Sequence, residues 1–261
     1  MNSKESLAYI ERELEKLRQK NKGIEDRKVL DQVFDKDTLL AIYKLMSDGV
    51  FETVEFPIST GKEGNVFLCK REDESYVALK IYRVATATFK RISSYIEGDP
   101  RFKGLYGNHR KIIFAWAAKE FRNLQRFYEA GVRVPHPIRF YKNLLVMEYI
   151  GTEEAPAPLM KDVTLDDPQE IYETLVKYMR LSFQKAELVH GDLSEYNVLI
   201  HDNSPVIIDC GQAVLIDHPN AREYLKRDIT NINEYFKSKK VKTLDSDEIF
   251  KVVMGEGLED S

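Results

Sequence analysis

Three polar side chains in the C-terminal half of the chain have the types and the spacing that phosphoryl transfer needs. Asp192 is followed five residues later by Asn197, and Asp209 comes directly after an apolar run, residues 206–208. Transfer with two metal ions requires a carboxylate that accepts a proton, an amide oxygen for one Mg²⁺, and a carboxylate for the ions on the phosphates. Either half alone is also explained by a polar hairpin between buried strands. Together they predict a catalytic and metal-binding site.

A lysine in an apolar strand supplies the cation that such a site needs. Lys80 stands in the string Val-Ala-Leu-Lys-Ile, where a buried ammonium group must reach water or find a partner. The string matches the strand-borne lysine that holds the α- and β-phosphates in protein kinases. Glu120, in a helix expected over residues 111–130, is the predicted partner, and Glu129 is the weaker candidate. A solvated carboxylate is the alternative for Glu120.

Two further segments are candidates for nucleotide contacts. A glycine-containing hairpin whose backbone amides approach an anion would cover the phosphates. It lacks the first glycine of the pattern G-x-G-x-x-G-x-V, and an ordinary hairpin turn is the alternative; its predicted contacts are Ser59, Thr60, Gly61, Lys62, Glu63, Gly64 and Val66. The second segment ends a predicted strand with the character of a hinge. There the backbone of Met147, Glu148 and Ile150 is expected to hold the adenine edge.

The periodicity of apolar residues predicts the elements that position these segments. Alternation with period two predicts a strand over residues 54–58, and further strands are expected over 66–70, 76–82, 138–141 and 144–149. Two more strands, 198–200 and 206–209, are expected to be joined by residues 201–205. Helical spacing predicts a narrow amphipathic helix within residues 3–30, a second helix from about residue 37 to 49, and a third that Asp166 or Asp167 caps before Pro168. Asn220 and Glu223 have the spacing of a capping box for a later helix, and a short helix is expected over residues 247–254.

Composition and charge limit the class of protein. The 261 residues are 43% hydrophobic and 31% charged, with a net charge of −4, so no overall charge favours nucleic acid or a membrane surface. The two cysteines form no disulfide framework, and no Cys/His set has zinc spacing. The N-terminus lacks the form of a signal peptide, and the longest apolar run, residues 112–118, is far too short for a membrane span. A cytoplasmic protein is therefore predicted.

A long insert, residues 83–110, separates Lys80 from the helix that carries Glu120. Its six basic residues against two acidic ones give a local excess of +4. It also contains Thr86, Thr88, Ser93 and Ser94. A loop of this length inside a compact domain is usually functional or mobile. We expect an arm near the nucleotide that contacts RNA or protein or is itself phosphorylated; an inert loop is the alternative.

These residues together resemble the RIO family of atypical serine/threonine protein kinases, and its type-one branch in particular. The strings that carry the resemblance are Ser59 to Val66, Lys80, His190 to Asn197 with Leu193-Ser194-Glu195-Tyr196, and Ile207-Ile208-Asp209-x-x-Gln212. The resemblance covers roughly residues 50–240. Gly191 stands where most protein kinases have an arginine, and only about a dozen residues separate Gly211 from the next predicted helix. An activation loop and a peptide-docking platform are therefore not expected.

The resemblance implies an α+β, two-lobed protein-kinase-like fold, with an antiparallel sheet in the N-lobe and a mainly helical C-lobe. The expected parts are a helical extension over residues 1–48, the N-lobe over 49–150 and the C-lobe over 151–261. It also implies ATP with Mg²⁺, or Mn²⁺ as a substitute. Asp192 would then be the catalytic base, Asn197 and Asp209 the metal ligands, and Lys80 with Glu120 the phosphate-holding pair.

Three functions remain open on the sequence. The first is a RIO-type kinase or ATPase that phosphorylates itself or a protein, passes through an aspartyl-phosphate at Asp209, and takes part in maturation of the small ribosomal subunit, with rRNA contact through the insert. The second is a small-molecule phosphotransferase of the aminoglycoside or choline kinase kind, which shares His-Gly-Asp-x-x-x-x-Asn. The third is a nucleotide-gated binding module for pre-ribosomal particles with little phosphotransfer.

Overall fold

The structure is a computed structural model, and its description is limited to part of the chain. The described residues are 35–61, 64–84, 95–96, 99, 101, 104–105, 108–153 and 155–256. They divide into two compact units, and each unit is described by itself. The first unit takes residues up to Arg91, Gly104–Phe121 and Pro137–Tyr149. The second takes Ile92–Lys103, Arg122–His136 and the chain from Ile150 onward.

Several predictions fall on residues outside this description. They are the amphipathic helix within residues 3–30, the phosphate contacts Lys62 and Glu63, and the hydroxyl-bearing residues of the insert, Thr86, Thr88, Ser93 and Ser94. Three of the six basic residues of the insert, Lys90, Arg91 and Lys103, also lie outside it. These predictions stay as they were made.

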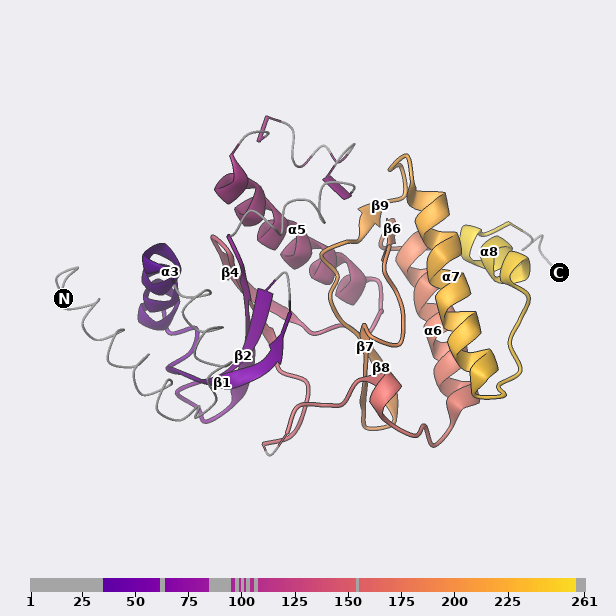
Figure 1. The fold of residues 1–261 in the computed structure, drawn as a ribbon, viewed down its shortest axis with the longest axis horizontal. Coiled ribbons are helices and arrows are strands. Elements are labelled where there is room, and N and C mark those ends of the chain that lie inside the picture. The colour runs from indigo at the N-terminus through magenta and orange to yellow at the C-terminus, as the bar shows by residue number, and fades with distance from the viewer. Residues whose placement is uncertain are drawn as a thin grey trace. The chain divides into compact units, whose positions relative to one another are not determined.

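The first unit is built on a five-stranded antiparallel sheet with the order β1-β2-β3-β5-β4. Figure 1 labels three of these strands, β1, β2 and β4. The strands are β1 Thr53–Thr60, β2 Gly64–Lys70, β3 Tyr76–Tyr82, β4 Pro137–Tyr141 and β5 Leu144–Glu148. Their period-two alternation divides the side chains between two faces of the sheet. One face is apolar, while the other carries Lys80 at the centre of β3, opposite Val66 of β2 and Leu145 of β5.

The helix α3, Lys36–Ser47, packs against the apolar face of this sheet (Figure 1). Asp35 caps its first turn by accepting the N–H of Thr38 at 2.8 Å. The side chains that join the helix to the sheet are all buried: Ala41, Ile42 and Leu45 of the helix, Phe67 and Cys69 of β2, Leu79 and Ile81 of β3, and Leu144 and Val146 of β5. The helix expected from about residue 37 is therefore part of the core of the first unit.

The helix α5, His109–Glu129, contributes residues to both units. It ends where the sequence indicated, because Gly131 adopts a positive φ of 85° and the N–H of Val132 donates to the carbonyl of Phe127 at 2.9 Å. Within this one helix, Glu120 belongs to the first unit and Asn123 to the second. Both side chains are almost completely buried.

The second unit consists mainly of helices, with two short two-stranded antiparallel sheets. The helices α6 Pro168–Gln184, α7 Ala221–Ser238 and α8 Ser246–Met254 lie side by side (Figure 1). Asp167 caps α6 by accepting the N–H of Glu170 at 2.9 Å, and Pro168 occupies the first helical position. One of the two sheets pairs β6 Leu188–Val189 with β9 Val214–Leu215, and the other is a hairpin of β7 Val198–His201 and β8 Ser204–Ile207. A short 3₁₀ helix, η2, spans Met160–Asp162.

Two details of the second unit differ from the sequence prediction. The strands β7 and β8 are joined by Asp202 and Asn203 alone, both with positive φ, so the turn is shorter than expected. Asn220 precedes α7, but its side chain makes no capping hydrogen bond, so the predicted capping box is wrong. The backbone of Asn220, with φ −100° and ψ 7°, departs from the extended conformation that a capping side chain usually requires.

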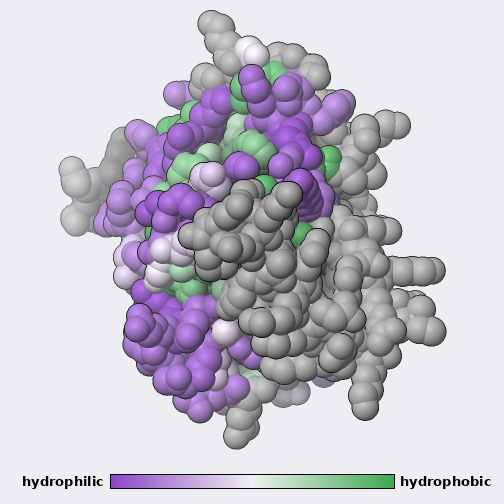
Figure 2. Space-filling model, turned by 90° about the vertical axis from the view of Figure 1, so that its left-hand side faces the viewer, coloured by the Kyte–Doolittle hydropathy of each residue, from purple (hydrophilic) through white to green (hydrophobic). Residues whose placement is uncertain are grey.

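None of the described helices is both long and apolar enough to span a membrane. On the face that Figure 2 shows, the described residues are mostly hydrophilic, with hydrophobic ones in small groups. A surface of this kind is ordinary for a globular protein in water.

Candidate active site

The loop between β6 and β7 brings together two of the residues that were singled out by their spacing. The amide nitrogen of Asn197 donates to the backbone carbonyl of Asp192 at 2.7 Å and lies 3.3 Å from its Oδ2 atom. Because the nitrogen faces Asp192, the amide oxygen is the atom that Asn197 offers to a ligand. The turn is closed by the N–H of Asn197, which donates to the carbonyl of Ser194 at 3.0 Å.

Asp228 of α7 holds this loop by two hydrogen bonds to its backbone. Its two carboxylate oxygens accept the N–H of Gly191 at 2.7 Å and that of Leu193 at 2.9 Å. Burial raises the pKa of Asp228 to about 7, although the two N–H donors and Arg227 act in the opposite direction. Asp192 therefore stands between two backbone groups that are fixed by one buried side chain.

His190 connects the loop of Asp192 to the segment that carries Asp209. Its Nε2 atom lies 3.1 Å from the carbonyl of Ile208, and its Nδ1 atom accepts the N–H of Asp192 at 3.3 Å. A single neutral tautomer, with the proton on Nε2, satisfies both contacts. The N–H of Ile208 in turn donates to the carbonyl of Asn197 at 2.9 Å. These contacts join the two halves of the predicted motif.

The carboxyl group of Asp192 has the character of a base. Its pKa is raised, chiefly by burial and also by the neighbouring carboxylate of Asp209, while Arg227 and the hydrogen bond from Asn197 lower it. A raised pKa makes the ionised carboxylate a better proton acceptor. The side chain is only half-buried, so it remains open to a hydroxyl group of an acceptor.

Asp209 follows β8 in a backbone conformation that is rare for a residue with a side chain. Its φ is 60°, which lies in the left-handed region. Carboxylate and amide oxygens, as in Asp209 and Asn197, are the ligands that Mg²⁺ prefers, and Mg²⁺ usually takes its remaining ligands from phosphates and water. Among the described residues no three His, Cys, Asp or Glu side chains cluster as a metal site. The oxygen atoms of Asp209 and Asn197 are of the kind that fits a magnesium ion.

Lys80 and Glu120 form a buried ion pair in the first unit. The Nζ atom of Lys80 lies 2.9 Å from each carboxylate oxygen of Glu120. Glu129, the weaker candidate, is exposed and belongs to the second unit. The pair fixes the position of the ammonium group at the centre of β3.

In the hairpin between β1 and β2, backbone atoms lie close to both glycines, Gly61 and Gly64. The N–H of Gly61 donates to the carbonyl of Gly64 at 2.9 Å, so this amide is already used inside the turn. A Cβ atom on Gly64 would lie 2.5 Å from the carbonyl oxygen of Ile81. Gly64 is therefore required by the close approach of β2 to β3. Ser59 and Thr60 are exposed at the end of β1, and Val66 is half-buried.

In the predicted hinge, residues 147–150, the carbonyl group of Ile150 already accepts a hydrogen bond. Met147 and Glu148 end β5 and pair with Ala78 and Val77 of β3. Ile150, at the start of the second unit, is buried, and its carbonyl oxygen accepts the N–H of Ala157 at 2.9 Å. The expectation of free backbone groups is thus wrong for this carbonyl.

Asp228 was not singled out from the sequence, and neither were Arg101 and Asn123. For Asp228 a signal was present in the sequence, because it lies at helical spacing from Leu225 and Ile232 on the apolar face of α7. A carboxylate on a buried helix face needs donors and is therefore a candidate for a structural or functional role.

Comparisons with known proteins give one family. The model of the RIO domain matches residues 65–249. The chain is 44% identical to the RIO-type serine/threonine-protein kinase Rio1 of Haloferax volcanii over 250 residues, which cover 96% of this chain and 86% of that protein. It is 39% identical to the human serine/threonine-protein kinase RIO1 over 256 residues, 94% of this chain, but it spans only 45% of that longer protein.

A solved structure agrees with these relatives. The Rio2 kinase–ADP/Mg²⁺–phosphoaspartate complex from Chaetomium thermophilum is 26% identical, with a TM-score of 0.63 over 84% of this chain and 67% of that one. The predicted α+β, kinase-like fold, with an antiparallel sheet followed by a mainly helical part, is confirmed.

Proposed function

This chain belongs to the RIO domain family of serine/threonine-protein kinases, and on that premise we propose that it transfers the γ-phosphoryl group of ATP to a hydroxyl group with Asp192 as the base. The predicted enzyme class, an ATP-dependent serine/threonine-protein kinase, is confirmed by the family. The observation that carries the roles of individual residues is the loop of Asp192 and Asn197, which is fixed by Asp228. Catalysis of phosphoryl transfer depends mostly on such positioning and on electrostatics.

Each side chain has one task in this proposal. Asp192 accepts the proton of the attacking hydroxyl group, and its raised pKa suits that task. Asn197 and Asp209 would hold Mg²⁺ through oxygen atoms, and the metal ion would neutralise charge on the phosphates. Lys80, oriented by Glu120, binds the α- and β-phosphates.

The remaining contacts concern the nucleotide. The hairpin of Ser59, Thr60, Gly61, Gly64 and Val66 would cover the phosphates, together with Lys62 and Glu63 from outside the described residues. The backbone of Met147 and Glu148 and the N–H of Ile150 would bind the adenine edge. The carbonyl of Ile150 is not part of this set, because Ala157 occupies it.

The experiment that tests this function follows transfer of labelled phosphate from ATP with Mg²⁺, first without any added acceptor. We expect self-labelling of the wild type and a loss of turnover by orders of magnitude in Asp192→Asn and in Asp209→Asn. Asp202→Asn is the matched control, because Asp202 is exposed in the turn between β7 and β8, where its positive φ also suits asparagine. Full activity of either active-site variant would reject the assignment.

The same assay separates the other two hypotheses. A small-molecule phosphotransferase would label an added amino alcohol or aminoglycoside and would not label itself. A nucleotide-gated binding module would show little transfer but would bind its particle differently with ATP, with ADP and without nucleotide. Mn²⁺ in place of Mg²⁺ should support transfer, because it also prefers oxygen ligands.

We further propose that Asp209 is itself an acceptor, which would make the protein an ATPase switch. A carboxylate oxygen of Asp209 would attack the γ-phosphorus, the bond to the β-γ bridging oxygen would break, and ADP would leave. Water would then hydrolyse the acyl phosphate. The Rio2 complex with ADP, Mg²⁺ and phosphoaspartate supports this proposal by analogy. Label that is lost in hydroxylamine, and absent from Asp209→Asn, would test it.

We also propose a role in maturation of the small ribosomal subunit, in the cytoplasm. Contact between the insert and rRNA is the part of this proposal that the structure supports least. The three described basic residues of the insert are already engaged within the chain. Arg83 donates to Asn65 at 3.2 Å, Arg101 binds Asp99 and Asn123, and Arg110 pairs with Asp35 and Asp37. Contact with rRNA would therefore depend on Lys90, Arg91 and Lys103. Replacing these three with glutamine should weaken binding to purified pre-ribosomal particles.

A further inference from the structure

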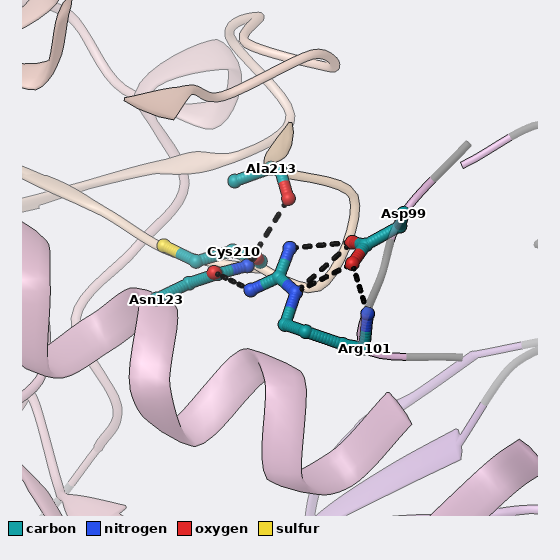
Figure 3. A network of polar contacts seen from close by, with 5 residues as sticks. All are labelled: Asp99, Arg101, Asn123, Cys210 and Ala213. Carbon is teal, nitrogen blue, oxygen red and sulfur yellow. Dashed lines mark hydrogen bonds and ion pairs between the residues drawn. The ribbon is translucent and has the colours of Figure 1, made fainter. Parts of the chain in front are cut away.

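The turn that follows Asp209 is held by a single buried side chain from α5. The amide nitrogen of Asn123 donates to the carbonyl of Cys210 at 2.8 Å and to the carbonyl of Ala213 at 3.2 Å (Figure 3). The two carbonyl groups stand at the two ends of the turn, and the N–H of Ala213 also donates to the carbonyl of Cys210 at 3.3 Å. Asn123 thus fixes the length and direction of this turn.

The orientation of the Asn123 amide decides whether it holds the turn or repels it. In the observed orientation both carbonyl oxygens face its NH₂ group. If the amide were flipped, its oxygen would face two carbonyl oxygens, and a buried amide without partners is costly. The two carbonyl groups therefore favour the observed orientation, and a donor beside the amide oxygen would reinforce it.

Arg101 of the insert is that donor. Its Nη1 atom donates to the Oδ1 atom of Asn123 at 2.9 Å. A guanidinium group has donors only, so it accepts an oxygen as its neighbour and excludes the NH₂ group of a flipped amide. Figure 3 shows the guanidinium group between the amide of Asn123 and the carboxylate of Asp99.

Asp99 fixes Arg101 in turn. The Nε atom of Arg101 lies 2.8 Å and 3.0 Å from the two carboxylate oxygens, and Nη2 donates to Oδ2 at 2.6 Å. The backbone N–H of Arg101 also donates to Oδ1 at 3.0 Å. The carboxylate is buried and the guanidinium group is largely buried. A paired, multiply hydrogen-bonded arrangement of this kind keeps its geometry better than an exposed ion pair.

We infer that Arg101, held by Asp99, is a positioning residue for the metal-binding carboxylate of Asp209, and that it acts through Asn123. This inference rests on the proposed role of Asp209 as a metal ligand. Asp209 needs outside support, because its positive φ is unfavourable for a residue with a side chain. The insert would therefore support the metal site indirectly, through Arg101 and Asp99.

The test measures metal binding directly, by titrating Mn²⁺ into the folded full-length chain with ADP present and following free Mn²⁺ by electron paramagnetic resonance. Replacing groups that orient metal ligands typically weakens metal binding by 10- to 100-fold, and Arg101 is one step further away. We expect Arg101→Met to raise the half-saturating Mn²⁺ concentration by about three- to tenfold, and Asn123→Leu by at least as much. The double variant should be no worse than Asn123→Leu, because both act on one link.

The controls separate positioning from stability. Arg126→Met removes an arginine of α5, which pairs with the exposed Glu187, and it should leave Mn²⁺ binding unchanged. A purely structural role of Arg101 would lower the melting temperature without moving the Mn²⁺ midpoint at temperatures where the chain is folded. If Arg101→Met does not fold, Arg101→Lys keeps a charge for Asp99 but lacks the fork that reaches Asn123, and it should show the same shift.

Asp209→Asn separates a failure of the proposed function from a failure of the inference about Arg101. If Asp209→Asn binds Mn²⁺ as the wild type does, the proposed function itself fails. If Asp209→Asn loses Mn²⁺ binding while Arg101→Met and Arg101→Lys keep the wild-type midpoint, only the inference about Arg101 is overturned.

Discussion

The ammonium nitrogen of Lys80 lies 2.9 Å from both carboxylate oxygens of Glu120, and the two side chains come from positions 40 residues apart. Both are buried, and the ammonium group also lies 5.1 Å from the centre of the Tyr82 ring. A buried pair adds little net stability, because desolvation offsets the attraction, but removing one partner leaves the other charge buried alone. Substitutions can therefore separate its structural role from its role toward ATP.

Lys80→Met should lower the free energy of unfolding by about 3–5 kcal/mol, because the carboxylate of Glu120 then stays buried without its partner. The double variant Lys80→Met with Glu120→Leu should recover most of this loss, since two apolar side chains replace two charges. Both variants should nevertheless lose self-labelling, because the group that binds the α- and β-phosphates is absent. Urea unfolding and the labelled-ATP assay measure the two effects.

The control for this series is Glu129→Gln on the same helix, where the side chain is exposed and should change stability by no more than about 0.5 kcal/mol. A double variant that is stable and phosphorylates itself at the wild-type rate would show that Lys80 has no role toward the nucleotide.

Gly64→Ala should destabilise the first unit by about 1–3 kcal/mol, because its new Cβ atom would meet a backbone oxygen that cannot move away easily. That atom is the carbonyl oxygen of Ile81, at 2.5 Å, in the region where β2 pairs with β3. Gly61→Ala is the matched control, since its nearest neighbour would be 3.2 Å away in an exposed turn. Equal urea-unfolding curves for the two variants would contradict the expected difference.

The elements that the sequence predicts well are those whose signals are local. The bounds of β3 agree with the predicted strand over residues 76–82, because a short apolar run after a charged turn is a signal from neighbouring residues. Asp167 caps α6 as expected, since a capping side chain and its N–H partner are three residues apart. Gly131 ends α5 for the same kind of reason.

The supports of the candidate site were not predictable in this way, because they join residues that are far apart in the chain. Asp228 contacts Gly191 and Leu193 from 37 and 35 residues away, and Asn123 reaches Cys210 across 87 residues. Periodicity and spacing carry no information about such pairs. Arg101 is a further case, because a basic residue in a basic insert predicts a solvated or ligand-binding side chain, whereas its guanidinium group binds inside the second unit.

The caps of the last two helices, α7 and α8, allow a direct test of how far sequence spacing predicts a capping hydrogen bond. Asn220 has the predicted spacing before α7 but makes no cap, whereas Asp245 accepts the N–H of Asp247 at 2.9 Å and forms a capping box with Glu248 at the start of α8. Asp245→Ala should lower the free energy of unfolding by about 1 kcal/mol, and Asn220→Ala by less than about 0.5 kcal/mol. Urea unfolding of both variants measures the difference. Equal losses would mean that Asn220 caps its helix in solution.

The pKa of Asp228 predicts how stability depends on pH. The buried carboxyl group has a pKa of about 7 in the folded chain, against an ordinary value of 3.8, so the folded chain holds this proton more tightly than the unfolded chain does. The stabilisation of the folded chain that results from this tighter proton binding is fully present below about pH 4. It is lost as the pH rises toward 7, with a slope of about 1.4 kcal/mol per pH unit. Above about pH 7 it should stay constant.

Asp228→Asn should remove this dependence, because asparagine keeps the size of the side chain and an acceptor oxygen but does not ionise. The unfolding free energy of the wild type should therefore fall relative to that of Asp228→Asn between about pH 4.5 and 7. Above about pH 7 the difference between the two proteins should level off. The raised pKa of Asp192 acts in the same direction in both proteins and largely cancels in the difference. Asp202→Asn, in an exposed turn, should give a difference that does not vary with pH. A constant difference for Asp228→Asn as well would mean that its carboxyl group is ionised throughout this range, held so by the N–H groups of Gly191 and Leu193.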